Sequence, residues 1–175
     1  MLKLSSRYYY LRHENEIQRF LSKNSNWIHI INKENSFKNF TNSKENLFLI
    51  DLNSNLSKQI QTIEDQKFDL IIITDIFEVT DDIYGLLNSL NKLLTNNGKI
   101  LINYINTKWN FPLLFFEFFK IKKISRPRSY IHLKKIYSIS ESSGFEVVKS
   151  FTRQIFPFRL FGIGNLLNII LEIIF

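Results

Sequence analysis

Residues 68–105 constrain the fold more strongly than any other part of this 175-residue chain. The run FDLIII at residues 68–73 is apolar and β-branched, which is typical of a strand covered on both faces in a parallel sheet. Leucine and isoleucine then recur at helical spacing from Ile83 to Leu94, and a second apolar run, KILINYI, occupies residues 99–105. A strand, a helix and a strand in this order form a crossover between parallel strands. The pattern therefore predicts an α/β fold.

Both ends of the predicted helix carry boundary signals. Asp81 and Asp82 precede it and suit the positive end of the helix dipole. Residues 95–98, Thr-Asn-Asn-Gly, follow it, and Gly98 is placed to adopt the left-handed conformation that commonly ends a helix. We therefore expect a turn at residues 95–98 and the next strand from Lys99.

Shorter apolar runs predict the remaining elements. Helices are expected over residues 7–22, 52–66, 111–121 and 133–142, and strands over residues 27–31, 47–50 and 145–148. Gly144 follows the last helix and is placed to close it. Neither a repeat nor a linker interrupts the sequence, so we expect a single domain over residues 1–175.

The scarcity of small and reactive residues excludes several kinds of site. The chain has five glycines and none precedes Gly85, so no glycine-rich phosphate or dinucleotide loop lies in the N-terminal half. The absence of cysteine excludes disulfides, thiolate metal sites and a cysteine nucleophile. The three histidines, His13, His29 and His132, are too scattered for a zinc site, so no metal is expected.

The net charge of +7 is concentrated in one segment. Residues 120–135 contain seven Lys and Arg residues and no acid, which equals the whole excess of positive charge. Such a segment is either a solvated loop and helix edge or a contact surface for nucleic acid, anionic lipid or an anionic substrate. Nucleic acid is the least favoured partner, because no recognition helix or aromatic sheet motif accompanies the charge.

The C-terminal residues 160–175 are strongly apolar. The run is shorter than the roughly 20 residues that a spanning helix needs. It is interpreted either as a helix that packs in the core or in a dimer, or as an interfacial helix that meets lipid together with residues 120–135. A cytoplasmic location is expected, with membrane association under the second interpretation. Because the chain stops within this apolar run, we also expect it to be shorter than its relatives.

Several motifs occur in a recognisable order. They are FDLIIITDIFE at residues 68–78, LLTNNG at 93–98, KILINY at 99–104 and SSGFEVV at 142–148. This series resembles the second half of the class I S-adenosylmethionine-dependent methyltransferases, over roughly residues 68–170. The apolar tail, residues 151–175, is similar to a bacterial subgroup associated with glycan and surface-polysaccharide functions.

The resemblance implies a Rossmann-like methyltransferase fold with a mostly parallel sheet. It also implies S-adenosylmethionine as the cofactor and a glycan or lipid-linked molecule as the methyl acceptor. The cofactor-binding candidates are Asp51, Asp75, Ile76 and Glu78. Asp51 stands where the family keeps a carboxylate for the ribose hydroxyls, and is otherwise a turn residue. Asp75 follows a strand, where open α/β sheets bind ligands, and is otherwise a helix cap.

The N-terminal half departs from the family's pattern. The family places a glycine-rich loop after its first strand, whereas residues 32–36 here are Asn-Lys-Glu-Asn-Ser. Side chains there would occupy space that the cofactor needs. Only 16 residues separate Asp51 from Phe68, too few for a helix and a third strand. Either one α/β unit is deleted, or Asp51 ends the third strand and the second is lost. We thus expect a reduced cofactor half at 1–67 and a better-preserved half at 68–150.

Two functional hypotheses follow. The first is an S-adenosylmethionine-dependent methyltransferase acting on a glycan or lipid-linked acceptor. Asn103 and Tyr104 end the next predicted strand, either lining the same crevice as Asp75 or, as the favoured alternative, serving as a buried satisfied amide and a core ring. The second is a catalytically inactive protein of the same fold with a binding or scaffolding role. The ordered motifs favour the first hypothesis, and the missing glycines favour the second.

Overall fold

A computed structural model describes residues 6–21, 26–32, 37, 44–51, 54–77, 80–104 and 131–150. Its centre is a sheet of four strands in the order β2-β1-β3-β4. The strands are β1 (Trp27–Asn32), β2 (Leu47–Ile50), β3 (Phe68–Thr74) and β4 (Leu94–Asn103). All three neighbouring pairs are parallel. The α/β prediction with a parallel sheet is therefore confirmed.

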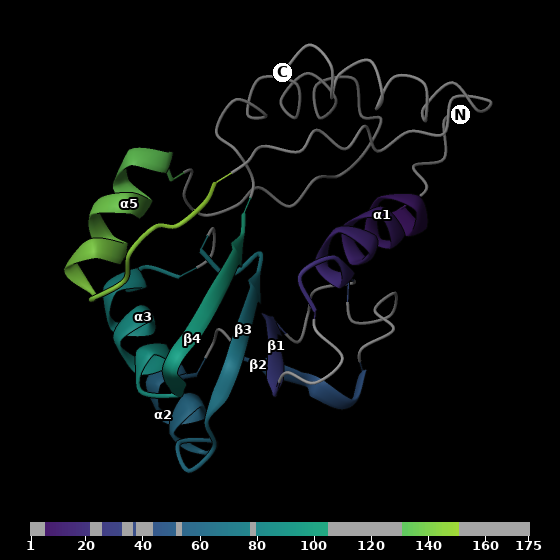
Figure 1. Ribbon diagram of the computed structural model, residues 1–175. Helices are drawn as coiled ribbons and strands as arrows, with labels where there is room; N and C mark the ends of the chain where they lie inside the picture. Colours follow the sequence, from purple (N-terminus) through teal and green to yellow (C-terminus); the bar gives the residue numbers. More distant parts are fainter. Residues whose placement is uncertain are drawn as a thin grey trace.

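Helices cover both faces of the sheet (Figure 1). They are α1 (Ser6–Gln18), α2 (Leu56–Gln61), α3 (Ile83–Asn91) and α5 (Leu133–Ser142), and a 3-10 turn, η2 (Lys44–Asn46), precedes β2. Helix α1 lies on one face, whereas α2, α3 and α5 lie on the other. This is the layered arrangement of a doubly wound α/β fold, in which each face of a parallel sheet is buried.

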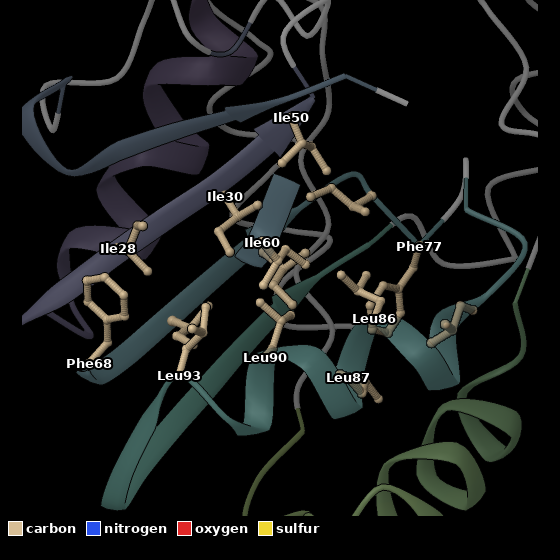
Figure 2. Close-up of a cluster of buried hydrophobic side chains, with 14 of the residues drawn as sticks. Ile28, Ile30, Ile50, Ile60, Phe68, Phe77, Leu86, Leu87, Leu90 and Leu93 are labelled. Carbon is tan, nitrogen blue, oxygen red and sulfur yellow. The ribbon is translucent and has the colours of Figure 1, made fainter. Parts of the chain in front are cut away.

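The alternation of side chains along the strands divides the core into two clusters. Ile28 and Ile30 of β1 point to the face covered by α2 and α3, whereas Ile31 of the same strand packs with Ile17 of α1. Figure 2 shows the larger cluster, in which the apolar side of α3 meets the strands. The buried residues of α3 are Ile83, Leu86, Leu87 and Leu90. They form the helix face that the spacing predicts.

The strand order shows how the N-terminal half is reduced. The usual doubly wound order is 3-2-1-4-5-6. The four strands described here match its 2-1-4-5 portion, because β2 pairs directly with β1. Between β2 and β3, residues 54–67 contain helix α2 and no strand. Of the two alternatives, the structure matches the deletion of one α/β unit, with Asp51 following the strand next to β1.

The expected turn at residues 95–98 is wrong. Helix α3 ends at Asn91, and β4 begins at Leu94 and continues through Gly98, which does not adopt a left-handed conformation. Phe68 is in register with Leu94 but Leu70 with Lys99, so β4 bulges between these positions. The Thr95 hydroxyl lies 2.9 Å from Oδ1 of Asp69. Pairing with β3 therefore draws this segment into the sheet.

Gly98 is required by close packing at this bulge. A Cβ atom there would lie 3.0 Å from the carbonyl oxygen of Phe68 and 2.9 Å from Cδ2 of Leu94. We expect Gly98→Ala to lower the free energy of unfolding by about 1–3 kcal/mol, as overpacking usually does. Urea unfolding measures the change. Asn97→Ala, at an exposed position in the same bulge, is the control. Equal stabilities for the two variants would contradict this reading of Gly98.

The segment after α5 differs in part from its prediction. Gly144 closes the helix with φ of 81°, as expected, and Phe145 packs against the larger core cluster. Residues 145–150 form no strand, however, so the strand expected at 145–148 is wrong. Val148 is 82% exposed, and the segment is tied to α5 by a hydrogen bond from the Tyr137 hydroxyl to Ser150. A local apolar run forms a strand only where a neighbouring strand accepts it.

Several predictions concern residues outside those that the structure describes. They are the helix at 111–121, most of the basic segment 120–135 and the apolar tail. Lys134 and Lys135 of the basic segment are described, and both are exposed on α5. Within the described ranges, no helix has the length and apolar character needed to cross a membrane.

Candidate functional site at the carboxyl edge of the sheet

The four strands end at one common edge. The register pairs Asn32 with Ile50, Ile31 with Thr74, and Thr74 with Asn103. The chain leaves β1 toward β2 on one side and later returns to place β3 on the other side. The gap between the ends of β1 and β3 is thus the topological switch point, where open α/β sheets bind ligands.

Asp51 lies at this edge, directly after β2, and is half-buried. Its backbone N–H donates to Oε1 of Gln59 at 2.7 Å, and its carbonyl accepts from Nε2 of the same side chain at 2.8 Å. The carbonyl also accepts from the N–H of Ser54 at 3.2 Å. Helix α2 therefore fixes the main chain of Asp51 through Gln59. Asp51 is a turn residue in this sense, and its position at the edge still suits a ligand contact.

Asp75 follows β3 and has an unusual backbone. Its φ angle is 54°, and among the described residues no other non-glycine residue has a positive φ. Its N–H donates to the carbonyl of Asn103 at 3.2 Å, so the sheet pairing continues to this residue. Helix capping does not explain Asp75, because Asp82 caps α3 by accepting from the N–H of Gly85 at 2.7 Å. Strained residues of this kind cluster at functional sites.

The other two predicted site residues contribute differently. Ile76 is fully buried in the larger core cluster, and its carbonyl accepts from the N–H of Thr80 at 3.0 Å. It anchors the loop after β3 rather than presenting a side chain at the edge. Glu78 lies outside the described residues.

Three further polar residues share the edge. Asn103 ends β4 beside Asp75, and Tyr104 follows it with its ring packed against the larger core cluster. Asn32 ends β1 at the switch point itself, and sequence reasoning did not single it out. Its signal was a polar residue that closes an otherwise apolar strand, WIHIIN. A cofactor at this edge would therefore meet amide and carboxylate groups from adjacent strands.

A buried polar pair lies beneath the edge, and sequence reasoning also missed it. Nε2 of His29 in β1 is 2.9 Å from Oγ1 of Thr74 in β3, and both residues are fully buried. Burial, together with a smaller effect of the nearby His13, lowers the pKa of His29 to about 3. The imidazole is therefore neutral at physiological pH. The available signal was a histidine inside an apolar strand.

The site has no described set of metal ligands. Among the residues that the structure describes, no group of three His, Cys, Asp or Glu side chains is close enough to hold a metal ion. The carboxylates of Asp51 and Asp75 suit hydroxyl groups instead, because an ionised carboxylate accepts strong hydrogen bonds.

Comparison with known proteins adds information on the fold. No family model and no curated protein matches the sequence. Eleven chains of solved structure match. One is a crystal structure from Thermotoga maritima described as a SAM-dependent methyltransferase and possible histamine N-methyltransferase. It is 13% identical, with a TM-score of 0.51, over 79% of this chain and 72% of that chain. This chain thus has a Rossmann-like methyltransferase fold, reduced in its N-terminal half.

Proposed function

We propose that this protein binds S-adenosylmethionine at the carboxyl edge of its sheet and transfers the methyl group to an acceptor. The observation that carries the proposal is the placement of Asp51 and Asp75. They follow the strands on either side of β1, at the edge where this fold binds ligands. The left-handed backbone of Asp75 supports a functional role for that position.

The residues at the edge match the ribose part of this cofactor best. Asp51 would accept hydrogen bonds from the two ribose hydroxyls, and its main chain is already fixed by Gln59. The bound cofactor supplies a methyl group on a sulfonium centre, which is reactive without a strong base. The chain's own task is then to orient the acceptor in line with that methyl group, since positioning supplies much of the rate.

Cofactor binding is tested with carboxylate variants of equal size. We expect Asp51→Asn to weaken the binding of S-adenosylmethionine by about 10- to 100-fold, because hydrogen bonds to charged groups contribute about 1.5–3 kcal/mol. Asp75→Asn is expected to act in the same direction, and asparagine tolerates the left-handed backbone. Isothermal titration calorimetry with the cofactor and with its demethylated product gives the affinities.

The matched control is Asp65→Asn, which removes an exposed carboxylate in the turn before β3, at the opposite edge. The Asp65→Asn variant is expected to bind S-adenosylmethionine with the same affinity as the unmodified protein. Absence of binding to the unmodified protein at millimolar cofactor would refute the proposal. An equal loss in the control would show that general charge, rather than this edge, governs binding.

A glycan or lipid-linked molecule is the acceptor class that we propose. It is supported by the similarity of residues 151–175 to the glycan-associated subgroup and by the basic segment 120–135. A cytoplasmic protein in peripheral contact with anionic lipid would meet such acceptors. Transfer of labelled methyl groups to lipid-linked saccharides, compared with free saccharides, would identify the acceptor.

An inactive protein with a binding or scaffolding role is the second candidate. It is favoured by one observation, the absence of glycine from the first 84 residues, which leaves side chains in the loop after β1. Under this alternative, S-adenosylmethionine does not raise the melting temperature. Replacement of Asp51 and Asp75 by alanine then leaves the effect of the cofactor on the melting temperature at zero, as in the unmodified protein.

A further inference from the structure

A series of buried contacts connects helix α1 to the carboxyl edge. The rings of His13 in α1 and Phe37 lie 4.8 Å apart, and the ring of His29 meets that of Phe37 edge-on at 5.3 Å. Nε2 of His29 is in turn 2.9 Å from Oγ1 of Thr74. None of the four residues is more than 3% exposed. The last of them immediately precedes Asp75.

The bond between His29 and Thr74 crosses the switch point. The register pairs His29 with Ile72 and Ile31 with Thr74, so the two side chains meet diagonally across β1 and β3. The apolar residues Ile17, Ile31 and Ile72 pack around them on this face, and the ring of His13 lies nearby. A hydrogen bond is directional, whereas the apolar contacts around it are not. The pair therefore fixes the orientation of the end of β3 more closely than packing alone.

The ring nitrogen of His29 that carries the hydrogen atom of the neutral imidazole can be assigned. Nδ1 of His29 is buried and has no hydrogen-bond partner in the described part of the structure. A proton on Nδ1 would leave a buried donor unsatisfied, which is rare in native structures. A proton on Nε2 is used in the bond to Oγ1 of Thr74. We therefore assign the Nε2–H tautomer, with His29 as donor and Thr74 as acceptor.

We propose that His29 and Thr74 form a positioning pair that holds the end of β3 and thereby the left-handed backbone of Asp75. Its effect on cofactor binding rests on the proposed function, whereas its effect on Asp75 does not. Stability alone does not explain the pair, because two apolar groups of the same shape can be equally stable in such a place. The pair acts through Asp75 and touches no substrate.

Two substitutions of Thr74 separate the hydroxyl from the packing. Thr74→Val keeps the shape and removes the hydroxyl, whereas Thr74→Ser keeps the hydroxyl. We expect Thr74→Val to shift the Cα and Cβ resonances of Asp75 away from left-handed values and to weaken cofactor binding about tenfold. Thr74→Ser is expected to preserve both properties. Nuclear magnetic resonance and calorimetry give the two readouts.

Thr95→Val is the matched control, because it removes a hydroxyl that contacts Asp69 at the other end of β3. It is expected to leave the resonances of Asp75 unchanged. The ring ¹⁵N shifts of His29 in the unmodified protein test the tautomer without any substitution. An Nδ1–H tautomer would overturn the assignment of donor and acceptor, because the Thr74 hydroxyl would then donate to Nε2. Cα and Cβ resonances of Asp75 outside the left-handed range in the unmodified protein would overturn the proposal even if Thr74→Val did not fold.

The two proposals fail in distinguishable ways. If the unmodified protein does not bind S-adenosylmethionine, the proposed function fails, and the resonances of Asp75 still test the positioning pair. If the cofactor binds but Thr74→Val leaves the resonances of Asp75 and the cofactor affinity unchanged, only the positioning pair is refuted. An equal disturbance by Thr74→Ser and Thr74→Val would also refute it, because the hydroxyl would then be irrelevant.

Discussion

Acidification from about pH 7 to about pH 5 is expected to lower the free energy of unfolding by about 4 kcal/mol, because two buried histidines must remain neutral. Burial lowers the pKa of His13 from 6.5 to about 4 and that of His29 from 6.5 to about 3. Below pH 6.5 the two histidines are protonated in the unfolded chain but remain neutral in the folded chain, so the unfolded chain binds more protons. The free energy of unfolding is therefore highest above pH 6.5. It falls by about 1.4 kcal/mol per histidine and pH unit as the pH drops from 6.5 toward the pKa values of the folded state.

Urea unfolding at a series of pH values measures this dependence. His13→Leu and His29→Leu are each expected to remove about half of it, since the two histidines contribute similarly over this range. His132→Gln is the control, because His132 is exposed at the start of α5. A free energy of unfolding that stays constant between about pH 7 and about pH 5 would contradict the prediction. Imidazole resonances of the unmodified protein give an independent measurement if the leucine variants do not fold.

Shortening a buried side chain on the α3 side of the core is also expected to lower the free energy of unfolding strongly. Leu90 is fully buried in the cluster that joins α3 to the sheet (Figure 2). We expect Leu90→Ala to lower the free energy of unfolding by about 2–5 kcal/mol, through lost burial and the cavity that remains. This is a large fraction of the roughly 5–15 kcal/mol that stabilises a typical domain. Urea unfolding at neutral pH measures it.

The same substitution at an exposed leucine separates burial from helix propensity. Leu133 is 44% exposed at the first position of α5. Leu133→Ala is expected to change the free energy of unfolding by no more than about 0.5 kcal/mol. Similar losses in the two variants would mean that Leu90 does not lie in a packed core.

The missing α/β unit affects the edge of the sheet rather than the switch point. In the usual strand order the absent third strand would pair with the outer side of β2, away from β3. Among the described residues β2 pairs only with β1, and its Leu49 is 44% exposed. The ends of β1 and β3 keep their arrangement. The reduced sheet can therefore still present Asp51 and Asp75 at one edge.

Local signals predicted elements well where burial and periodicity agree. The run FDLIII became β3, the apolar spacing after it became α3, and Gly144 took the expected left-handed conformation after α5. The signals at 95–98 and 145–148 were misleading for a common reason. Pairing with β3 drew the Thr-Asn-Asn-Gly segment into β4, and the described structure offers no neighbouring strand to residues 145–148.

The candidate site was predictable in part. The sequence showed that Asp51 and Asp75 each follow a buried strand, which in a parallel sheet places them at the carboxyl edge. It did not show that Asp75 adopts a left-handed backbone or that His29 bonds to Thr74, 45 residues away in the chain. Those features depend on which strands are neighbours and in what register.

The amino-acid sequence alone determined the α/β class, most strand and helix positions and the polar residues that end the strands, because burial repeats with the period of each local structure. Only the tertiary structure decided that β2 lies beside β1, that Gly98 lies within a bulge, and that His29 reaches Thr74 beneath Asp75. Those arrangements arise from contacts between residues far apart in the chain, and a local pattern carries no information about which distant segment will be its neighbour.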